Sequence, residues 1–348
     1  MRRRHRPRSL DGRPTVSVVI PCYNYGRFLP DAVSAALDQE QVHVEVIIVD
    51  DASTDDSAEV AARLAEHPQV QLLRHEHNRG HIATYNDGLD LATGDYVTLV
   101  SADDLVARNA LTRAVALMET HRDVGLVYGY ARSFVGAPEP DERPVRSWSV
   151  YGGREWLAIT ARRGRCFLVS PEAVLRREAW EAAGAYDPRL PHSADFALWL
   201  DTAAGFDIGR VNGPVQAHYR VHDLNMHLTE YAGWLTDLEQ RRRTFDLFFA
   251  ERGAALGEAD ALHASARRAL AAEALRRGSA AAREHDPQAA RYLELAESID
   301  PALAAGPRGR VARRVVARGV GEPTASTWRF LEKVDHHLQW RRERRYGT

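Results

Sequence analysis

Few features of the disulfide-rich, zinc-binding or membrane-spanning protein classes occur in this sequence. The two cysteines, Cys22 and Cys166, cannot build a disulfide framework, and no group of Cys and His residues has the spacing of a zinc site. No run approaches the roughly 18 apolar residues of a membrane span. The arginine-rich start of the chain is not followed by the apolar segment of a signal peptide. We therefore expect a cytoplasmic protein with reduced thiols.

Strong charge of one sign is also lacking. The 348 residues carry a formal net charge of -2, which argues against nucleic-acid binding through overall charge. The glycines of the G-x-G-x-x-G motif are absent after the first apolar run, so NAD is not expected. No Ser/His/Asp or Cys/His arrangement indicates a covalent intermediate. The 45% of hydrophobic residues is nevertheless enough for a sizeable core.

The first 130 residues alternate between short apolar runs and helical patterns. Because the runs are rich in β-branched residues and are apolar at nearly every position, they are typical of strands buried on both faces. The alternation predicts an α/β fold with a mostly parallel sheet flanked by helices. The predicted strands are Val16–Ile20, Val44–Val49, Val70–Leu73, Tyr96–Val100 and Gly125–Tyr130.

Three regions of different character are expected along the chain. Residues 1–14 read as a flexible basic arm, 15–230 as the α/β domain, and 231–348 as a helical C-terminal extension. Within the α/β domain, the proline-rich segment Phe134–Ser149 predicts a long connection or lid, and Asp207–Val211 and Val215–Arg220 read as edge strands.

The helical extension contains an expected helix pair and a basic helix. Leu262–Arg277 and Pro287–Ser298 form the pair. Arg308–Arg318 is a basic amphipathic stretch, which suits either packing on a neighbouring helix or peripheral contact with the inner face of an anionic membrane.

Paired acids follow the strand that ends at Val100. Asp103 and Asp104 lie beyond the carboxyl end of this strand, where ligands bind in open α/β sheets. Two adjacent carboxylates suit a Mg²⁺ or Mn²⁺ ion that bridges to nucleotide phosphates. The alternative is that one of them caps a helix beginning near Arg108.

Asp51 follows the strand Val44–Val49 in the same way. At the carboxyl end of a strand, its carboxylate can accept a hydrogen bond from a pyrimidine N–H or from a ribose. Asn78 and Arg79, in a loop after the third strand, are candidates to donate hydrogen bonds, although an Arg in a loop is often simply solvated.

Two further candidates lie late in the α/β domain. Asp195 begins a helix, and the helix dipole alone would favour an ionised acid at this position. The functional alternative is that Asp195 is a general base. The same dipole would weaken its basicity. His222 is either a metal ligand or phosphate donor, or a histidine without such a role.

Four motifs then stand in one order along the chain. Pro21-Cys22-Tyr23-Asn24 follows the first strand, Asp50-Asp51 the second, and Ser101-Ala102-Asp103-Asp104 a later one, and Asp195 opens a helix. Over about Pro14–Asn225, this ordered set resembles the family 2 inverting glycosyltransferases of the GT-A fold, the group of the SpsA-like enzymes.

The resemblance implies a role for each matching residue. Asp51 would read the uracil of a UDP-sugar, Asp104 would ligate the metal with Asp103 nearer the ribose, and Asp195 would be the catalytic base. His222 would face the diphosphate and metal. The nucleotide-binding set is completed by Pro21, Tyr23, Asn24, Asn78 and Arg79.

Two motifs depart from the family pattern. Ala102-Asp103-Asp104 stands where a literal D-x-D is usual, which leaves open which acid holds the metal. Ala194-Asp195 replaces the usual Glu-Asp pair before the base.

We therefore predict a metal-dependent inverting glycosyltransferase. It would use Mn²⁺ or Mg²⁺ and a UDP-sugar, or a dTDP-sugar, with a carbohydrate, lipid-linked or small-metabolite acceptor. One alternative is a sugar nucleotidyltransferase, which needs a Gly-rich basic loop that Pro21–Gly26 does not supply. The other is a non-catalytic sugar- or nucleotide-binding module of the same fold.

Overall fold

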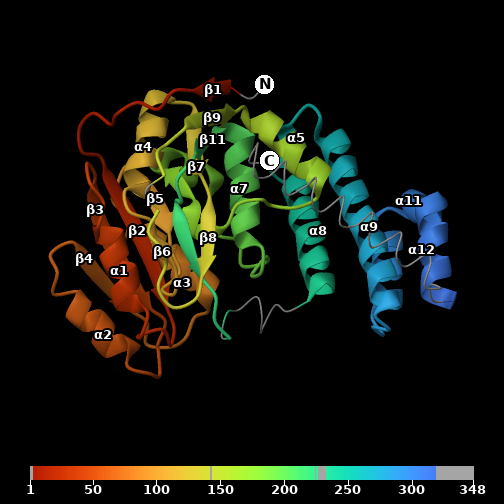
Figure 1. The fold of residues 1–348 in the computed structure, drawn as a ribbon, viewed down its shortest axis with the longest axis horizontal. Coiled ribbons are helices and arrows are strands. Elements are labelled where there is room, and N and C mark those ends of the chain that lie inside the picture. Colours follow the sequence, from red (N-terminus) through yellow and green to blue (C-terminus); the bar gives the residue numbers. More distant parts are fainter. Residues whose placement is uncertain (1–2, 142, 224, 226–232, 319–348) are drawn as a thin grey trace. The chain divides into compact units, whose positions relative to one another are not determined.

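A computed structural model describes residues 3–141, 143–223, 225 and 233–318, which form two compact units (Figure 1). The first unit comprises the described residues up to Leu157 together with Leu168–Asn225. The second comprises Ala158–Phe167 and the described residues after Asn225. Ala158–Phe167 therefore groups with the helical region, although its position in the sequence suggested the α/β domain. Residues 319–348 of the predicted helical extension lie outside the described part.

A nine-stranded sheet is the centre of the first unit. Its strand order is β1-β9-β11-β7-β10-β5-β2-β3-β4, and β5, β2, β3 and β4 are parallel neighbours. These four confirm the predicted parallel sheet. Their bounds are Thr15–Cys22 for β2, His43–Asp50 for β3, Val70–Arg74 for β4 and Tyr96–Leu99 for β5.

The side chains of β2 divide between the two faces of this sheet. Val18 and Ile20 belong to the buried cluster that also contains α1 (Leu29–Leu37) and α4 (Ala110–Thr120). Val19, between them in sequence, faces α3 (His81–Asp90), where Gly88 packs against it. Because alternate strand residues point to opposite faces, helices cover both faces, and α2 (Ser57–Leu64) adds a contact with β3 and β4.

The other half of the sheet is mixed. Strand β10 (Val174–Arg176) is antiparallel to both β5 and β7 (Val124–Tyr128). Strand β11 (Asp207–Asn212) is parallel to β7 and antiparallel to β9 (Ser147–Tyr151). The prediction of β11 as an edge strand is therefore wrong. Strand β11 has a neighbour on each side, and its Ile208 and Val211 are almost fully buried.

Two stretches expected to lack regular structure contain strands. Arg3–His5, in the predicted flexible arm, is strand β1 and pairs antiparallel with β9. Strand β9 itself lies at the end of the segment expected to form a connection or lid. Its Trp148 and Tyr151 are buried, so tertiary packing overrides the proline and charge content that precedes them in sequence.

A separate three-stranded sheet has the order β6-β12-β8. Strand β12 (Ala217–Arg220) is antiparallel to β6 (Leu105–Val106) and parallel to β8 (Ala131–Phe134). The second predicted edge strand is therefore also wrong, because β12 is the central strand of this sheet. Its pairing with β6 brings residues near 220 beside the turn that contains Asp103 and Asp104.

Helices fill the remaining chain. Between β9 and β11 in the sequence they are α5 (Gly153–Arg163), the short 3-10 helix η1 (Ser170–Glu172), α6 (Arg177–Ala183) and α7 (Ala194–Gly205). The second unit contains α8 (Trp234–Ala250), η3 (Gly253–Ala255), α9 (Ala259–Arg283), α10 (Ala289–Ile299), α11 (Pro301–Ala305) and α12 (Pro307–Arg318). The predicted helix pair corresponds to α9 and α10, which pack against each other.

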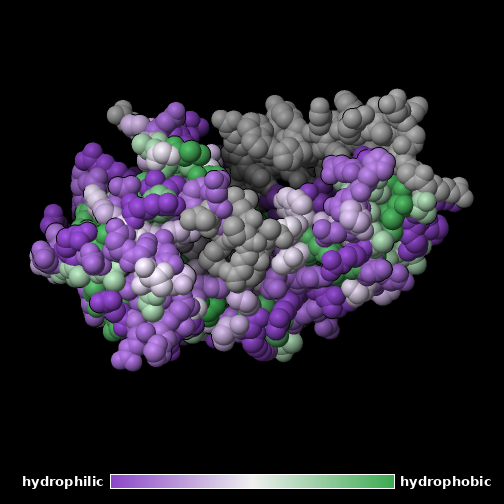
Figure 2. Space-filling model, turned by 90° about the horizontal axis from the view of Figure 1, so that it is seen from below, coloured by the Kyte–Doolittle hydropathy of each residue, from purple (hydrophilic) through white to green (hydrophobic). Residues whose placement is uncertain are grey.

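The basic helix α12 packs on α9, α10 and α11. Arg313 donates a hydrogen bond to the carbonyl of Ala304 at 2.8 Å, and Ala312 is buried. No described helix has the length and apolar character needed to cross a membrane. On the face drawn in Figure 2, the described residues are mostly hydrophilic, and the hydrophobic ones form small separate patches.

Close packing of α3 on the sheet gives a stability prediction. A Cβ at Gly88 would lie 2.5 Å from Cγ1 of Val19 and 2.8 Å from Cγ2 of Val49. We expect Gly88→Ala to lower the free energy of unfolding by about 1 to 2 kcal/mol, because the strain exceeds the gain in helix propensity. Urea denaturation measures this.

The matched control is Gly205→Ala at the end of α7, where a Cβ would meet nothing within 4 Å. This variant should be neutral or slightly stabilised. Equal effects of the two substitutions would contradict the close packing of α3.

Candidate active site

Asp51 follows β3 directly and is hydrogen bonded to the loop that leads into α3. Its Oδ1 accepts from the backbone N–H of Arg79 at 2.7 Å and from Nδ1 of His75 at 2.8 Å. Its Oδ2 accepts from the backbone N–H of Gly80 at 3.0 Å. Burial alone raises the pKa of Asp51, but these hydrogen bonds outweigh it and the pKa is lowered. Asp51 is therefore a fixed, ionised acceptor.

The loop after β2 contains the first predicted motif. Asn24 has a positive φ of 59°, and its Oδ1 accepts from the backbone N–H of Thr54 at 2.8 Å. Asn24 thus joins the loops that follow β2 and β3. Pro21 is still within β2, opposite Val49, while the Tyr23 side chain is exposed.

Asn78 and Arg79 make contacts within their own loop. Oδ1 of Asn78 accepts from the backbone N–H of Gly80 at 3.1 Å. The Arg79 guanidinium pairs with Asp87 of α3 at 2.5 Å and remains about half exposed. Both side chains therefore help to shape the loop that holds Asp51.

Asp103 and Asp104 lie in a tight turn between β5 and β6. The backbone N–H of Asp104 donates to the carbonyl of Ser101 at 2.9 Å. Helix α4 begins at Ala110 with Asn109 as its N-cap, so neither acid caps it. The helix-capping alternative for these acids is therefore wrong, since β6 lies between them and the helix.

Asp103 is joined to the segment after β12. Its Oδ2 lies 3.0 Å from Nε2 of His222 and 3.3 Å from Nδ2 of Asn225. The His222 ring packs against the rings of Tyr25 and Phe28, with centroid distances of 5.5 and 5.0 Å. The fold thus brings two predicted site residues, separated by more than a hundred positions, into direct contact.

Asp104 is more deeply buried than a carboxylate usually is. Burial raises its pKa well above the ordinary value, and the neighbouring charge of Asp103 raises it further. A hydrogen bond from the backbone N–H of Arg220 to Oδ1, 2.9 Å long, only partly offsets this. A cation beside Asp104 would favour its ionised form.

The donor chemistry suits a divalent cation. Among the described residues, no three or more His, Cys, Asp or Glu side chains are arranged to hold a metal ion. Mg²⁺ commonly takes only one or two carboxylates and completes its coordination with substrate phosphates and water. Asp103 and Asp104 supply carboxylate oxygens, which Mg²⁺ and Mn²⁺ prefer, and the His222 imidazole lies beside Asp103.

Arg220 was not predicted as a site residue. Its guanidinium donates to the carbonyls of Asp103 at 2.8 Å and Gly136 at 3.0 Å, and to Oδ2 of Asp31 at 3.2 Å. It also lies over the rings of Phe28 and Phe134, 4.7 Å from each centroid. No sequence pattern in the strand Ala-His-Tyr-Arg singles Arg220 out, and only the pairing of β12 with β6 reveals its partners.

Asp195 lies in the first turn of α7. Burial raises its pKa to about 6, although a hydrogen bond from Tyr186 and the charge of His81 oppose this. The expected lowering by the helix dipole is thus outweighed by loss of solvation. The carboxylate is ionised at neutral pH and basic enough to take a proton.

The start of α3 connects Asp51 with Asp195. Gly80, the N-cap of α3, donates to Asp51, and the next residue, His81, lies near Asp195 with Nε2 2.8 Å from the Pro191 carbonyl. Ser170, which also acts on the Asp195 carboxyl, begins η1, which contacts β5, β6 and β12. The three acidic positions therefore belong to one contiguous part of the unit.

Residues 17–181 match the family model described as glycosyl transferase family 2. This region is a family 2 glycosyltransferase domain. An uncharacterized glycosyltransferase from Nostoc sp. is 27% identical over 62% of this chain and 67% of its own length. The chain spans 40% and 43% of the length of two other curated relatives.

Solved structures support the GT-A fold of the glycosyltransferase domain. Staphylococcus aureus TarS in complex with UDP-GlcNAc aligns with a TM-score of 0.60 at 18% identity, over 87% of this chain and 88% of the other. The mannosyltransferase PcManGT from Pyrobaculum calidifontis, in complex with GDP-Man and Mn²⁺, gives 0.55 at 21% identity, over 99% and 90%. At these identities the likeness concerns the fold.

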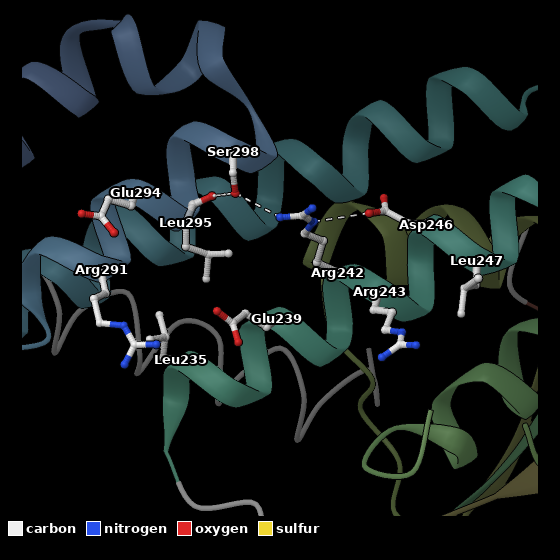
Figure 3. Close-up of a pocket in the computed structure, with 10 residues that line it drawn as sticks. All are labelled: Leu235, Glu239, Arg242, Arg243, Asp246, Leu247, Arg291, Glu294, Leu295 and Ser298. Atoms are coloured by element: carbon white, nitrogen blue, oxygen red, sulfur yellow. Dashed lines mark hydrogen bonds and ion pairs between the residues drawn. The ribbon is translucent and has the colours of Figure 1, made fainter. Parts of the chain in front are cut away.

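A cavity of about 650 Å³ lies in the helical unit, between α8 and α10 (Figure 3). Leu235 and Leu295 contribute apolar surface, and Arg242 is held by Ser298 at 3.0 Å and by Asp246 at 3.4 Å. None of the catalytic, nucleotide-binding or metal-binding residues predicted from the sequence lines this cavity.

The contacts of Arg220 give a second stability prediction. Arg220→Leu removes hydrogen bonds to two backbone carbonyls and a carboxylate, and we expect the free energy of unfolding to fall by about 3 kcal/mol. Arg27→Leu is the matched control, because exposed Arg27 also lies over Phe28, at 4.5 Å. That change should cost less than about 1 kcal/mol. Similar urea midpoints for both variants would contradict this role of Arg220.

Proposed function

We propose that the protein is an inverting, metal-dependent glycosyltransferase that moves a sugar from a UDP-sugar to an acceptor hydroxyl. The observation that carries the proposal is the linkage of Asp51, the Asp103–Asp104 turn and Asp195 through the start of α3 and through η1. We assign Asp51 to the nucleotide, the Asp103–Asp104 turn to the cation, and Asp195 to the acceptor.

The nucleotide part of the sugar donor is assigned to the loops after β2 and β3. Asp51 accepts a hydrogen bond from the pyrimidine, and the exposed ring of Tyr23 is available to stack on it. Pro21 and Asn24 shape this side of the site, as Asn78 and Arg79 shape the other. Nucleotide-sugar complexes of two proteins with this fold support a donor of this class.

The cation is assigned to Asp104 and His222, and the ribose to Asp103, whose Oδ2 contacts His222. When bound, Mn²⁺ or Mg²⁺ stabilises the charge that develops on the leaving diphosphate. The raised pKa of Asp104 supports this assignment, because a buried carboxylate next to another needs an opposite charge to ionise. Arg220 is a positioning residue that holds the turn in place.

Asp195 is assigned as general base for the acceptor. A pKa of about 6 leaves it ionised at neutral pH, so it can remove the proton from a hydroxyl that attacks the anomeric carbon in line. A single displacement inverts the configuration and needs no covalent intermediate. The acceptor class is a carbohydrate, lipid-linked or small-metabolite hydroxyl.

Replacing the base should separate catalysis from binding. We expect Asp195→Asn to lower kcat about 100-fold or more, because the amide cannot take the acceptor proton, with little change in the Kd for UDP. Donor turnover and calorimetric UDP binding give the two values. Asp90→Asn, at an exposed position of α3, should leave both unchanged.

The pH dependence of the wild type checks the same assignment. Asp195 is ionised above its pKa, so kcat/KM should fall as the pH decreases through about 6. Wild-type turnover by Asp195→Asn would exclude Asp195 as the base.

Removal of the cation should affect turnover and donor binding together. We expect EDTA to abolish donor turnover and added Mn²⁺ to restore it, because the diphosphate then lacks its counter-charge. Asp104→Asn should require a much higher Mn²⁺ concentration. Asp38→Asn, an exposed acid at the end of α1, is the control. Full activity after metal removal would contradict the metal assignment.

A further inference from the structure

The two oxygens of the Asp51 carboxylate have different surroundings. Oδ1 accepts two hydrogen bonds, from the backbone N–H of Arg79 at 2.7 Å and from Nδ1 of His75 at 2.8 Å. A carboxylate oxygen has two lone-pair positions, so both positions of Oδ1 are occupied.

His75 is held in this position from its other side. Its Nε2 lies 3.1 Å from Oδ2 of Asp87, and the same carboxylate pairs with the Arg79 guanidinium at 2.5 Å. Only 5% of the His75 side chain is exposed. Asp51, His75, Asp87 and Arg79 thus form a closed ring of contacts that fixes the imidazole against Oδ1.

Oδ2 of Asp51 accepts fewer hydrogen bonds than Oδ1. It accepts from the backbone N–H of Gly80 at 3.0 Å. The Thr84 side chain is close enough to help lower the pKa of Asp51, but its single hydroxyl proton is directed at the Gly80 carbonyl, 2.9 Å away, and is not available to Oδ2 at the same time. One acceptor position therefore remains on Oδ2, and 4% of the Asp51 side chain is exposed.

Nucleobases differ in how many donors they present along one edge. Uracil and thymine offer a single N3–H between two carbonyl oxygens, which matches one remaining acceptor position. Guanine offers N1–H and the 2-amino group side by side, which suits a carboxylate with both oxygens open. Because Asp51 has one remaining acceptor position, one of the two guanine N–H groups would be buried without a hydrogen-bond acceptor. This disfavours guanine.

We propose that His75 determines nucleobase specificity by occupying Oδ1 of Asp51, so that the site selects uracil or thymine over guanine. This inference rests on the proposed function, since it assumes that the base of a nucleotide-sugar contacts Asp51. His75 acts through Asp51 and is a positioning residue. The expectation differs from PcManGT, which has the same fold and binds GDP-Man.

The test compares the binding of UDP and GDP by titration calorimetry with Mn²⁺ present. We expect the wild type to bind UDP at least about tenfold more tightly than GDP. In H75L an acceptor position on Oδ1 becomes open, and the UDP-to-GDP ratio should fall at least about fivefold. H75N should keep the wild-type ratio, because its amide nitrogen can donate in place of Nδ1.

The matched control is H77L, two residues away in the same loop, where His77 is exposed; its ratio should equal that of the wild type. If H75L does not fold, D87N serves instead, because it removes the charge that holds Nε2, and its ratio should also fall. Equal or tighter binding of GDP by the wild type overturns the inference. An unchanged ratio in folded H75L, or in D87N as its substitute, does the same.

These results are distinguishable from failure of the proposed function. A wild type that binds neither UDP nor GDP contradicts the glycosyltransferase proposal itself, and the inference with it. A wild type that binds both with no preference contradicts the inference and leaves a nucleotide-dependent enzyme in place.

Discussion

The burial of two adjacent carboxylates at the end of β5 is the constraint on which the site depends. Asp103 and Asp104 repel each other, and burial makes the ionised form of Asp104 costly. Arg220 of β12 supplies polar groups to both residues. Its backbone N–H donates to the Asp104 carboxylate, and its guanidinium donates to the backbone carbonyl of Asp103. The small sheet β6-β12-β8 brings these groups together, so its integrity and that of the acidic turn are linked.

The start of α3 has a comparable role for the other two acids. The backbone N–H groups of Gly80 and Arg79 donate to Asp51, and His81, which follows directly, interacts electrostatically with Asp195. The packing of Gly88 against β2 and β3 fixes the helix whose first residues form these contacts. A displacement of α3 would therefore alter the proposed nucleotide position and the proposed acceptor position together. The rigidity of α3 is a shared condition for the proposed binding of donor and acceptor.

Sequence patterns were most informative where local and tertiary preferences agree. The apolar runs of β2, β3, β4 and β5 specify buried strands, and the acids that follow them identify the ligand-binding end of the sheet. The patterns predicted β11 and β12 as strands but placed them at sheet edges, and they missed β9. In these short strands with polar residues, position and burial depend on the neighbouring strands and helices. The patterns also gave no reason to single out Arg220 or His75, because both act through residues distant in sequence.

The amino-acid sequence by itself determined the alternating α/β architecture, the helical C-terminal region and the candidate acids, since each depends on periodicity or on residue type at a strand end. Only the tertiary structure decided which groups these acids contact. It brought His222 to Asp103, raised the pKa of Asp195 by burial, and left Asp51 with one oxygen saturated. Solvation and hydrogen bonding depend on the surrounding atoms, and those atoms come from parts of the chain that no local pattern connects.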